Sequence, residues 1–91
     1  MQITQNSATT KIPVLMVSTS DDKTAVTGAT VTVQVSKNGG AFATVAGSVT
    51  EIANGWYVCT LSATETNTVG PLLVRATATS ADEWRDIHQV V

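Results

Sequence analysis

Alternation of apolar and polar residues is the dominant pattern along this chain. Within residues 29–36, Val31, Val33 and Val35 alternate with threonine, glutamine and serine. Successive side chains of a strand point to opposite faces, so the pattern predicts one face in a core and one in water. Such a strand is typical of an antiparallel sheet with one wet side.

Further strands are predicted on both sides of this segment. Residues 56–61 are mostly apolar on both faces, which predicts a central strand with Trp56 and Tyr57 in the core. In residues 84–91 neither face is uniformly apolar, which predicts an edge strand or an incompletely buried end. The other predicted strands cover residues 12–17, 41–45, 48–52 and 72–79.

Short turn signals separate these strands. The pairs Asn38-Gly39 and Asn54-Gly55 favour tight hairpin turns, because both residue types tolerate positive φ. A phosphate-binding loop is the alternative for residues 38–40, but the sequence lacks the GxxxxGK[ST] pattern. Ser62 and Glu65 have the spacing of a capping box, which predicts a short helical turn at residues 62–68.

The strand count and the turn spacing together predict the fold. About seven short strands, with turn signals roughly every ten residues, indicate an all-β immunoglobulin-like antiparallel sandwich. We expect this domain to cover residues 12–91 and a flexible, polar N-terminal arm to cover residues 1–11. The chain has a single cysteine, so the disulfide of antibody domains is not expected.

Composition and charge narrow the range of partners. Charged residues make up 13% of the chain and the net charge is -2, against roughly 25% charged residues in soluble domains. The five lysines and arginines are scattered without a basic stripe, so we do not expect nucleic-acid binding. The apolar run at residues 13–17 is too short to span a bilayer and no signal peptide is evident, which predicts a soluble cytoplasmic product.

Few residues suggest chemistry. Cys59 lies in an apolar run and is expected to be an inert core thiol, with an intermolecular bridge or a reactive thiol as alternatives. His88 is the only histidine and is interpreted as an exposed strand residue beside Asp86. Asp21-Asp22 lacks the spacing of a calcium loop and is interpreted as a solvated loop. We therefore expect no catalytic residues, no metal, no cofactor and no enzymatic activity.

The aromatic residues leave two alternatives open. Trp84 stands among acidic and basic residues, so it either folds over a sandwich edge or contacts another chain. Phe42, Trp56, Tyr57 and Trp84 could also form a stacking platform for a sugar or for single-stranded nucleic acid.

Four segments carry a resemblance to a known family. They are TGATVTV at residues 27–33, NGG at 38–40, NGWY at 54–57 and ETNTVGPL at 65–72. With these segments, residues 12–91 resemble the immunoglobulin-like module of tailed-bacteriophage structural proteins, similar to the N-terminal domains of upper-baseplate and head-fibre proteins. The motifs mark turns and core positions and define no binding site.

The resemblance implies a non-enzymatic virion protein made in the cytoplasm of a bacterial host. A capsid decoration or head-surface attachment protein is expected first, present in many copies or as a homo-oligomer on major capsid or other virion subunits. A tail or baseplate subunit and a carbohydrate-binding adhesion module acting through Trp84 are the alternatives. We expect partner contacts from the arm and from the start of the last strand, at Gln2, Ile3, Thr4, Gln5, Trp84 and Arg85.

Overall fold

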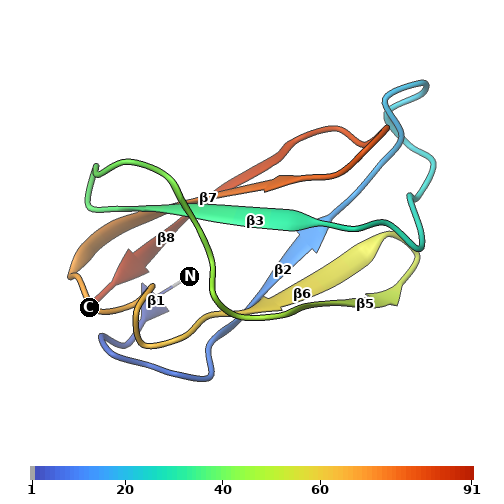
Figure 1. The fold of residues 1–91 in the computed structure, drawn as a ribbon. Helices are drawn as coiled ribbons and strands as arrows, with labels where there is room; N and C mark the ends of the chain where they lie inside the picture. The colour runs from blue at the N-terminus through green and yellow to red at the C-terminus, as the bar shows by residue number, and fades with distance from the viewer. Residues whose placement is uncertain (1) are drawn as a thin grey trace.

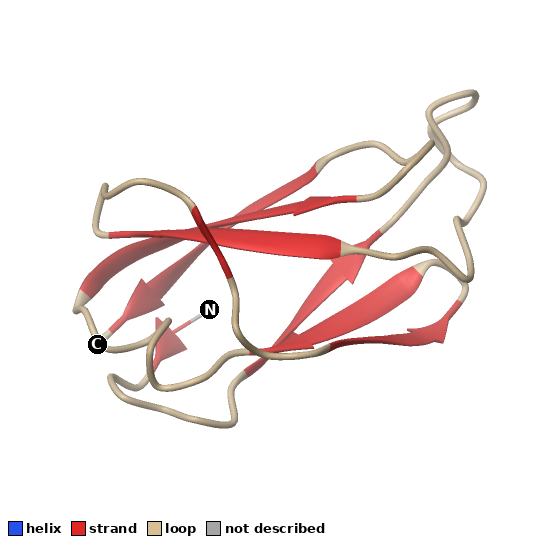
Figure 2. Cartoon of the chain, viewed as in Figure 1, coloured by secondary structure: helices blue, strands red, loops and turns tan. Residues whose placement is uncertain are grey.

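The computed structural model describes residues 2–91, which form two β-sheets and no helix (Figures 1 and 2). Five strands form the first sheet, in the order β1 (Gln2–Ile3), β8 (Trp84–Val90), β7 (Gly70–Thr77), β3 (Thr32–Lys37) and β4 (Ala43–Thr44). Three strands form the second, in the order β2 (Lys11–Leu15), β6 (Trp56–Thr60) and β5 (Val49–Ala53). Within residues 2–91 there is no helix long and apolar enough to cross a membrane.

One apolar core joins the inner faces of the two sheets. In β3, Val33 and Val35 are buried and Thr32 is exposed, as the alternation predicts, but Ser36 is buried and its hydroxyl donates to the Gly40 carbonyl at 2.6 Å. In β6, Tyr57 and Cys59 are buried in the same way. The buried residues of both sheets belong to a single cluster. The prediction of an all-β, sandwich-like domain is therefore confirmed.

The two Asn-Gly pairs form turns as predicted. Asn54 and Gly55 have φ of 55° and 84°, and they join β5 to β6 with Ala53 opposite Trp56. A Cβ atom at Gly55 would lie 2.7 Å from the Met16 carbonyl oxygen, so position 55 requires glycine. Asn38 and Gly39 also have positive φ, at the start of a longer loop between β3 and β4.

The helical turn predicted at residues 62–68 is wrong, since this segment forms turns without a helix. The capping contacts exist: the Ser62 backbone N–H donates to Glu65 Oε1 at 2.8 Å. However, the segment is rich in β-branched threonine, and the Thr66 hydroxyl donates to the Ser7 carbonyl at 2.8 Å. The segment at residues 62–68 therefore makes a tertiary contact with the N-terminal arm.

The position of β6 confirms one prediction and corrects another. β6 lies between β2 and β5, so it is the central strand of its sheet, as predicted. Tyr57 is buried, and its hydroxyl donates to the Val26 carbonyl at 2.8 Å and accepts the Ala29 N–H at 3.1 Å. Trp56 is 40% exposed, because it points to the outer face, so its assignment to the core is wrong.

The two ends of the described chain meet beside β8 (Figure 1). β1 runs parallel to β8, with Gln2 opposite Gln89 and Ile3 opposite Val90. The Val91 N–H donates to the Ile3 carbonyl, and the Gln5 N–H donates to the Val91 carbonyl. Met1, the first residue of the predicted arm, lies outside the described residues.

Candidate functional site

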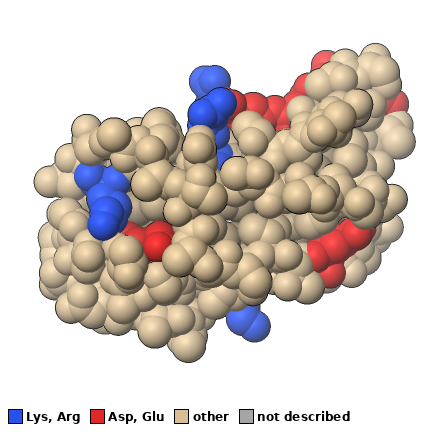
Figure 3. All heavy atoms as spheres, viewed as in Figure 1, with Lys and Arg blue, Asp and Glu red and all other residues tan. Residues whose placement is uncertain are grey.

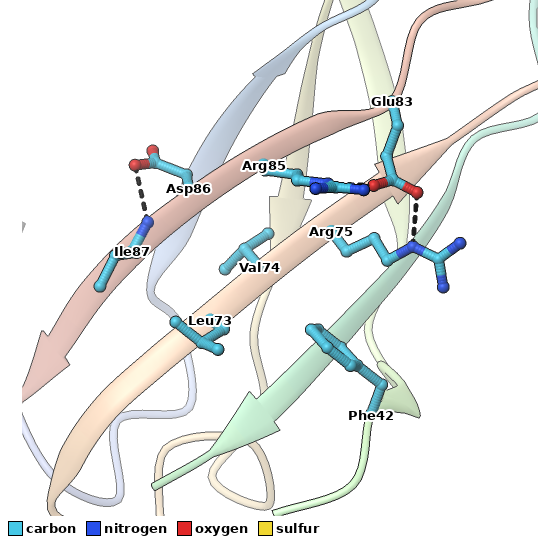
Figure 4. Close-up of a pocket in the computed structure, with 8 residues that line it drawn as sticks. All are labelled: Phe42, Leu73, Val74, Arg75, Glu83, Arg85, Asp86 and Ile87. Carbon is cyan, nitrogen blue, oxygen red and sulfur yellow. Dashed lines mark hydrogen bonds and ion pairs between the residues drawn. The ribbon is translucent and has the colours of Figure 1, made fainter. Parts of the chain in front are cut away.

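An open groove of about 760 Å³ lies on the outer face of the five-stranded sheet (Figure 4). Its walls come from β7, from β8 with the residue that precedes it, and from the loop that precedes β4. The lining residues are Phe42, Leu73, Val74, Arg75, Glu83, Arg85, Asp86 and Ile87.

The antiparallel register of β7 and β8 builds this groove in two rows. Leu73 lies opposite Ile87 and forms an apolar row, while Arg75 lies opposite Arg85 and forms a charged row. Both rows point outward, because residues two apart on a strand share a face. The Phe42 side chain, 45% exposed, stands across the groove from them and is carried by the loop before β4.

Glu83 organises the charged row. The Nε atom of Arg75 donates to Glu83 Oε1 at 2.6 Å, and the Nε atom of Arg85 donates to Glu83 Oε2. Arg75 also donates from Nη1 to the Gln34 side-chain oxygen at 3.0 Å. These hydrogen bonds, from Arg75 first and then Arg85, lower the pKa of the Glu83 carboxyl. The side chain of Arg85 is still 81% exposed, so its terminal N–H groups face solvent.

Charged side chains are sparse on the face of the molecule shown in Figure 3, where lysine and arginine lie in separate places. An apolar patch beside ordered donors is characteristic of a surface that recognises another molecule. The groove therefore offers apolar contact together with guanidinium N–H groups for an acceptor.

The residues expected to bind a partner do not form one site. Trp84 and Gln89, the residue opposite Gln2, are five residues apart, which is roughly 17 Å along β8. Arg85 lines the groove, whereas Trp84 points to the other face of the strand. Of the expected residues, only Arg85 lies in the groove.

The arm residues have different surroundings. Gln2, Thr4 and Gln5 are exposed, and the Gln5 side chain donates to the Asn67 carbonyl at 2.9 Å. Ile3 is buried in the core, which leaves its side chain unavailable to a partner in this structure. The flexibility predicted for the arm stays a prediction, although two of its residues belong to the five-stranded sheet.

Trp84 packs partly against the core and partly against another tryptophan. Its ring lies 6.4 Å from that of Trp56, at 71°, which is an edge-to-face arrangement. Phe42 lies apart in the groove and Tyr57 is buried. The four aromatic residues therefore do not form a single stacking platform.

His88 is 4% exposed, so its interpretation as an exposed residue is wrong. The strand register turns His88 inward together with Val90, and Leu72 lies opposite it. Burial lowers the pKa of the imidazole, while Asp86 acts in the opposite direction from 3.5 Å. Among residues 2–91, neither ring nitrogen has a hydrogen-bond partner.

The remaining candidates for chemistry lie in the core or in loops. Cys59 is fully buried, which raises the pKa of its thiol to about 11, as expected for an inert core thiol. The Asp21 carboxylate accepts the Lys23 and Thr24 N–H groups and so shapes its loop. Hydrogen bonding to Asp22 raises the pKa of Asp82. Within the described range, no three histidine, cysteine or acidic side chains are placed to hold a metal ion.

Comparisons of the chain with protein-family models, with curated proteins and with solved structures found no match. The resemblance of residues 12–91 to phage structural modules therefore stays a prediction based on the four segments.

Sequence reasoning missed most of the groove. Leu73 and Arg75 belong to the strand predicted at residues 72–79, but nothing in the sequence pattern places Ile87 beside Leu73. Phe42 comes from a distant loop. One signal in the sequence is that Leu73 and Ile87 each lie two residues from an arginine in a predicted strand, on the same face of that strand.

Proposed function

We propose that this chain is a non-enzymatic structural protein of a bacteriophage particle that acts by protein–protein association. Capsid decoration or head-surface attachment is the leading role. The groove of the five-stranded sheet is the observation that carries the proposal, because it combines exposed apolar side chains with arginine. The resemblance of the four sequence segments supplies the class of particle.

The order of the strands supports an immunoglobulin-like fold as part of this proposal. If β2 is counted as strand B, then β3, β7 and β8 take the places of strands C, F and G in one sheet. β6 and β5 take the places of strands E and D in the other. In this arrangement the groove lies on the outer face of the sheet that contains the strands in the C, F and G places.

The composition of the groove favours a protein as its partner. Aromatic residues and arginine are enriched in the centres of protein interfaces, where a few residues contribute most of the binding energy. Phe42, Ile87 and Arg85 supply an aromatic, an aliphatic and a guanidinium group in one groove. We infer that a neighbouring virion subunit covers these three side chains.

The test is the protein composition of purified particles. Mass spectrometry of whole particles, and of separated heads and tails, would measure the copies of this chain relative to the major capsid protein. We expect many copies in the head fraction. Recovery in the tail fraction would support the tail or baseplate alternative, and absence from particles would refute a virion role.

The carbohydrate-binding alternative has less support. Trp84 would have to offer a flat ring to a sugar, but its ring is packed against Trp56 and the core. A glycan array is the direct test: binding that is lost in Trp84→Ala but kept in Ile87→Asp would favour this alternative over association through the groove.

A further inference from the structure

The outer edge of β8 is only partly covered. On its other side β8 pairs with β7 from Trp84 to Val90, whereas β1 pairs with it only at Gln89 and Val90. Among residues 2–91, no strand covers the edge of β8 from Arg85 to Ile87. An uncovered edge of this kind is a template for another strand.

The backbone groups that face this edge can be identified from the register. Both the N–H and the C=O group of Val91 bond to residues of the N-terminal segment, so residue 91 faces the edge. Edge-facing residues alternate along a strand paired in antiparallel fashion, so residues 85, 87 and 89 face it as well. Arg85 and Ile87 therefore direct two N–H and two C=O groups away from β7.

The Asp86 side chain accepts a hydrogen bond from one of these edge-facing N–H groups. Its Oδ1 atom accepts the N–H of Ile87 at 2.8 Å (Figure 4). Its Oδ2 atom lies 3.5 Å from Nε2 of His88. A side chain of β8 itself therefore accepts the hydrogen bond from the N–H group that an incoming strand would need.

The edge matches a second copy of itself. If two β8 strands paired antiparallel about Asp86, Arg85 of each would lie opposite Ile87 of the other, and the four edge-facing groups of each chain could bond across. The aliphatic stem of arginine could then cover isoleucine. The two Asp86 carboxylates would face each other at a close pair, with Cα atoms about 4.5 Å apart, where like charges destabilise pairing.

We propose that Asp86 keeps this edge closed, and that its neutralisation allows β8 to pair with β8 of a second copy. The device is separate from the proposed virion role, since it concerns the chain alone. Charged side chains on edge strands commonly prevent sheet-to-sheet association. Here the same carboxylate both occupies a donor and repels its own copy.

The test is the mass of the purified chain in solution, measured by light scattering over a series of concentrations. We expect Asp86→Ala to dimerise with a dissociation constant at least about tenfold below that of the wild type. Asp86→Asn removes the charge and keeps an acceptor oxygen, so it should shift the constant in the same direction by less. If Asp86→Ala does not fold, Asp86→Asn provides the test.

The matched control uses Ile87→Pro, which deletes the edge-facing N–H without deleting a bond to β7. Adding it to Asp86→Ala should restore the wild-type mass. Folded Asp86 variants with the same association constant as the wild type would overturn the proposal. A dimer that persists after Ile87→Pro would overturn it too, because association would then not use this edge.

Discussion

The two outer faces of the sandwich expose isoleucine equally but arrange it differently. Ile87 on the five-stranded sheet and Ile52 on the three-stranded sheet are each 64% exposed. Ile87 lines a groove beside Arg85 and across from Phe42. Ile52 lies on β5, where every residue after Val49 is exposed, and it does not line the groove.

This contrast shows that the exposure of an apolar side chain does not by itself indicate a binding surface. Single exposed apolar residues are common on soluble proteins and need no explanation. What distinguishes the five-stranded face is that Glu83 holds two guanidinium groups beside the apolar row. Holding polar groups in place before binding reduces the entropy lost on association. The three-stranded face lacks such an arrangement within the described residues, and we interpret it as scaffold.

The largest expected effect comes from placing a charge in the groove. Ile87→Asp should weaken binding to particles that lack this chain by about 30-fold, which is roughly 2 kcal/mol, because the carboxylate would be buried in the interface. Titration of such particles with the purified variant measures this change.

Ile52→Asp is the matched control, since the starting residue and its exposure are the same. Its binding should stay within about twofold of the wild type, as is usual for residues outside an interface. Equal losses in both variants would remove the distinction between the faces, and a loss in Ile52→Asp alone would reverse it.

The next effect concerns the scaffold. Tyr57→Phe should lower the free energy of unfolding by about 1–3 kcal/mol, because the Val26 carbonyl and the Ala29 N–H both lose their side-chain partner. Urea unfolding measures the loss, and the same protein should bind particles as the wild type does. Weaker binding at a temperature where the variant is fully folded would contradict a purely structural role for Tyr57.

Most of the core could be predicted from sequence because the longer strands carry their own evidence, whereas β1, which places Ile3 in the core, lies in the segment predicted as an arm. Val33 and Val35 alternate with polar residues, and Asn54-Gly55 has the positive φ values that such pairs favour. The capping pattern of Ser62 and Glu65 led to a wrong prediction of a helical turn, because the local pattern does not contain the long-range contact of Thr66 with the N-terminal arm. A local sequence pattern predicts local structure well only where no distant segment forms hydrogen bonds with the same residues.

The groove could not be predicted for the same reason. Whether Leu73 faces Ile87 depends on the register between β7 and β8, and a shift of one residue would turn the whole row inward. The alternation of residues 84–91 also left open which face lies inside. The sequence therefore predicts an exposed His88, although the register with β7 turns this side chain into the core.

The interior beneath the five-stranded sheet should respond to acid through His88. Because the pKa of the buried imidazole lies below its ordinary value of 6.5, the unfolded chain binds a proton first as pH falls. Stability should therefore be full above about pH 6.5 and decrease as pH falls through the lower pKa of the folded chain.

His88→Met should abolish this decrease, since His88 is the only histidine in the chain. Urea unfolding at intervals between pH 8 and pH 5 measures it for both proteins. Parallel curves for the variant and the wild type would show that His88 does not control this range.

The smallest expected effect comes from Glu83→Gln, which keeps both arginines but changes the carboxylate that holds them in place. The hydrogen bonds from Arg75 and Arg85 lower the pKa of Glu83 below its ordinary value of 4.5. Their stabilising contribution is therefore complete above pH 4.5 and is lost as pH falls through the lower pKa of the folded chain. Glu83→Gln should be slightly less stable than the wild type at pH 7, and the two proteins should converge in strong acid.

Nitrogen NMR of the arginine Nε–H groups would follow the same change in the groove itself. In the wild type the two signals should shift together as Glu83 is protonated, whereas in Glu83→Gln they should already have the acid positions at pH 7. Glu51→Gln removes a carboxylate from the three-stranded sheet and should leave both signals in place. If it moved them equally, the arginines would be sensing the net charge of the chain, and the ordered row that distinguishes the five-stranded face would not exist in solution.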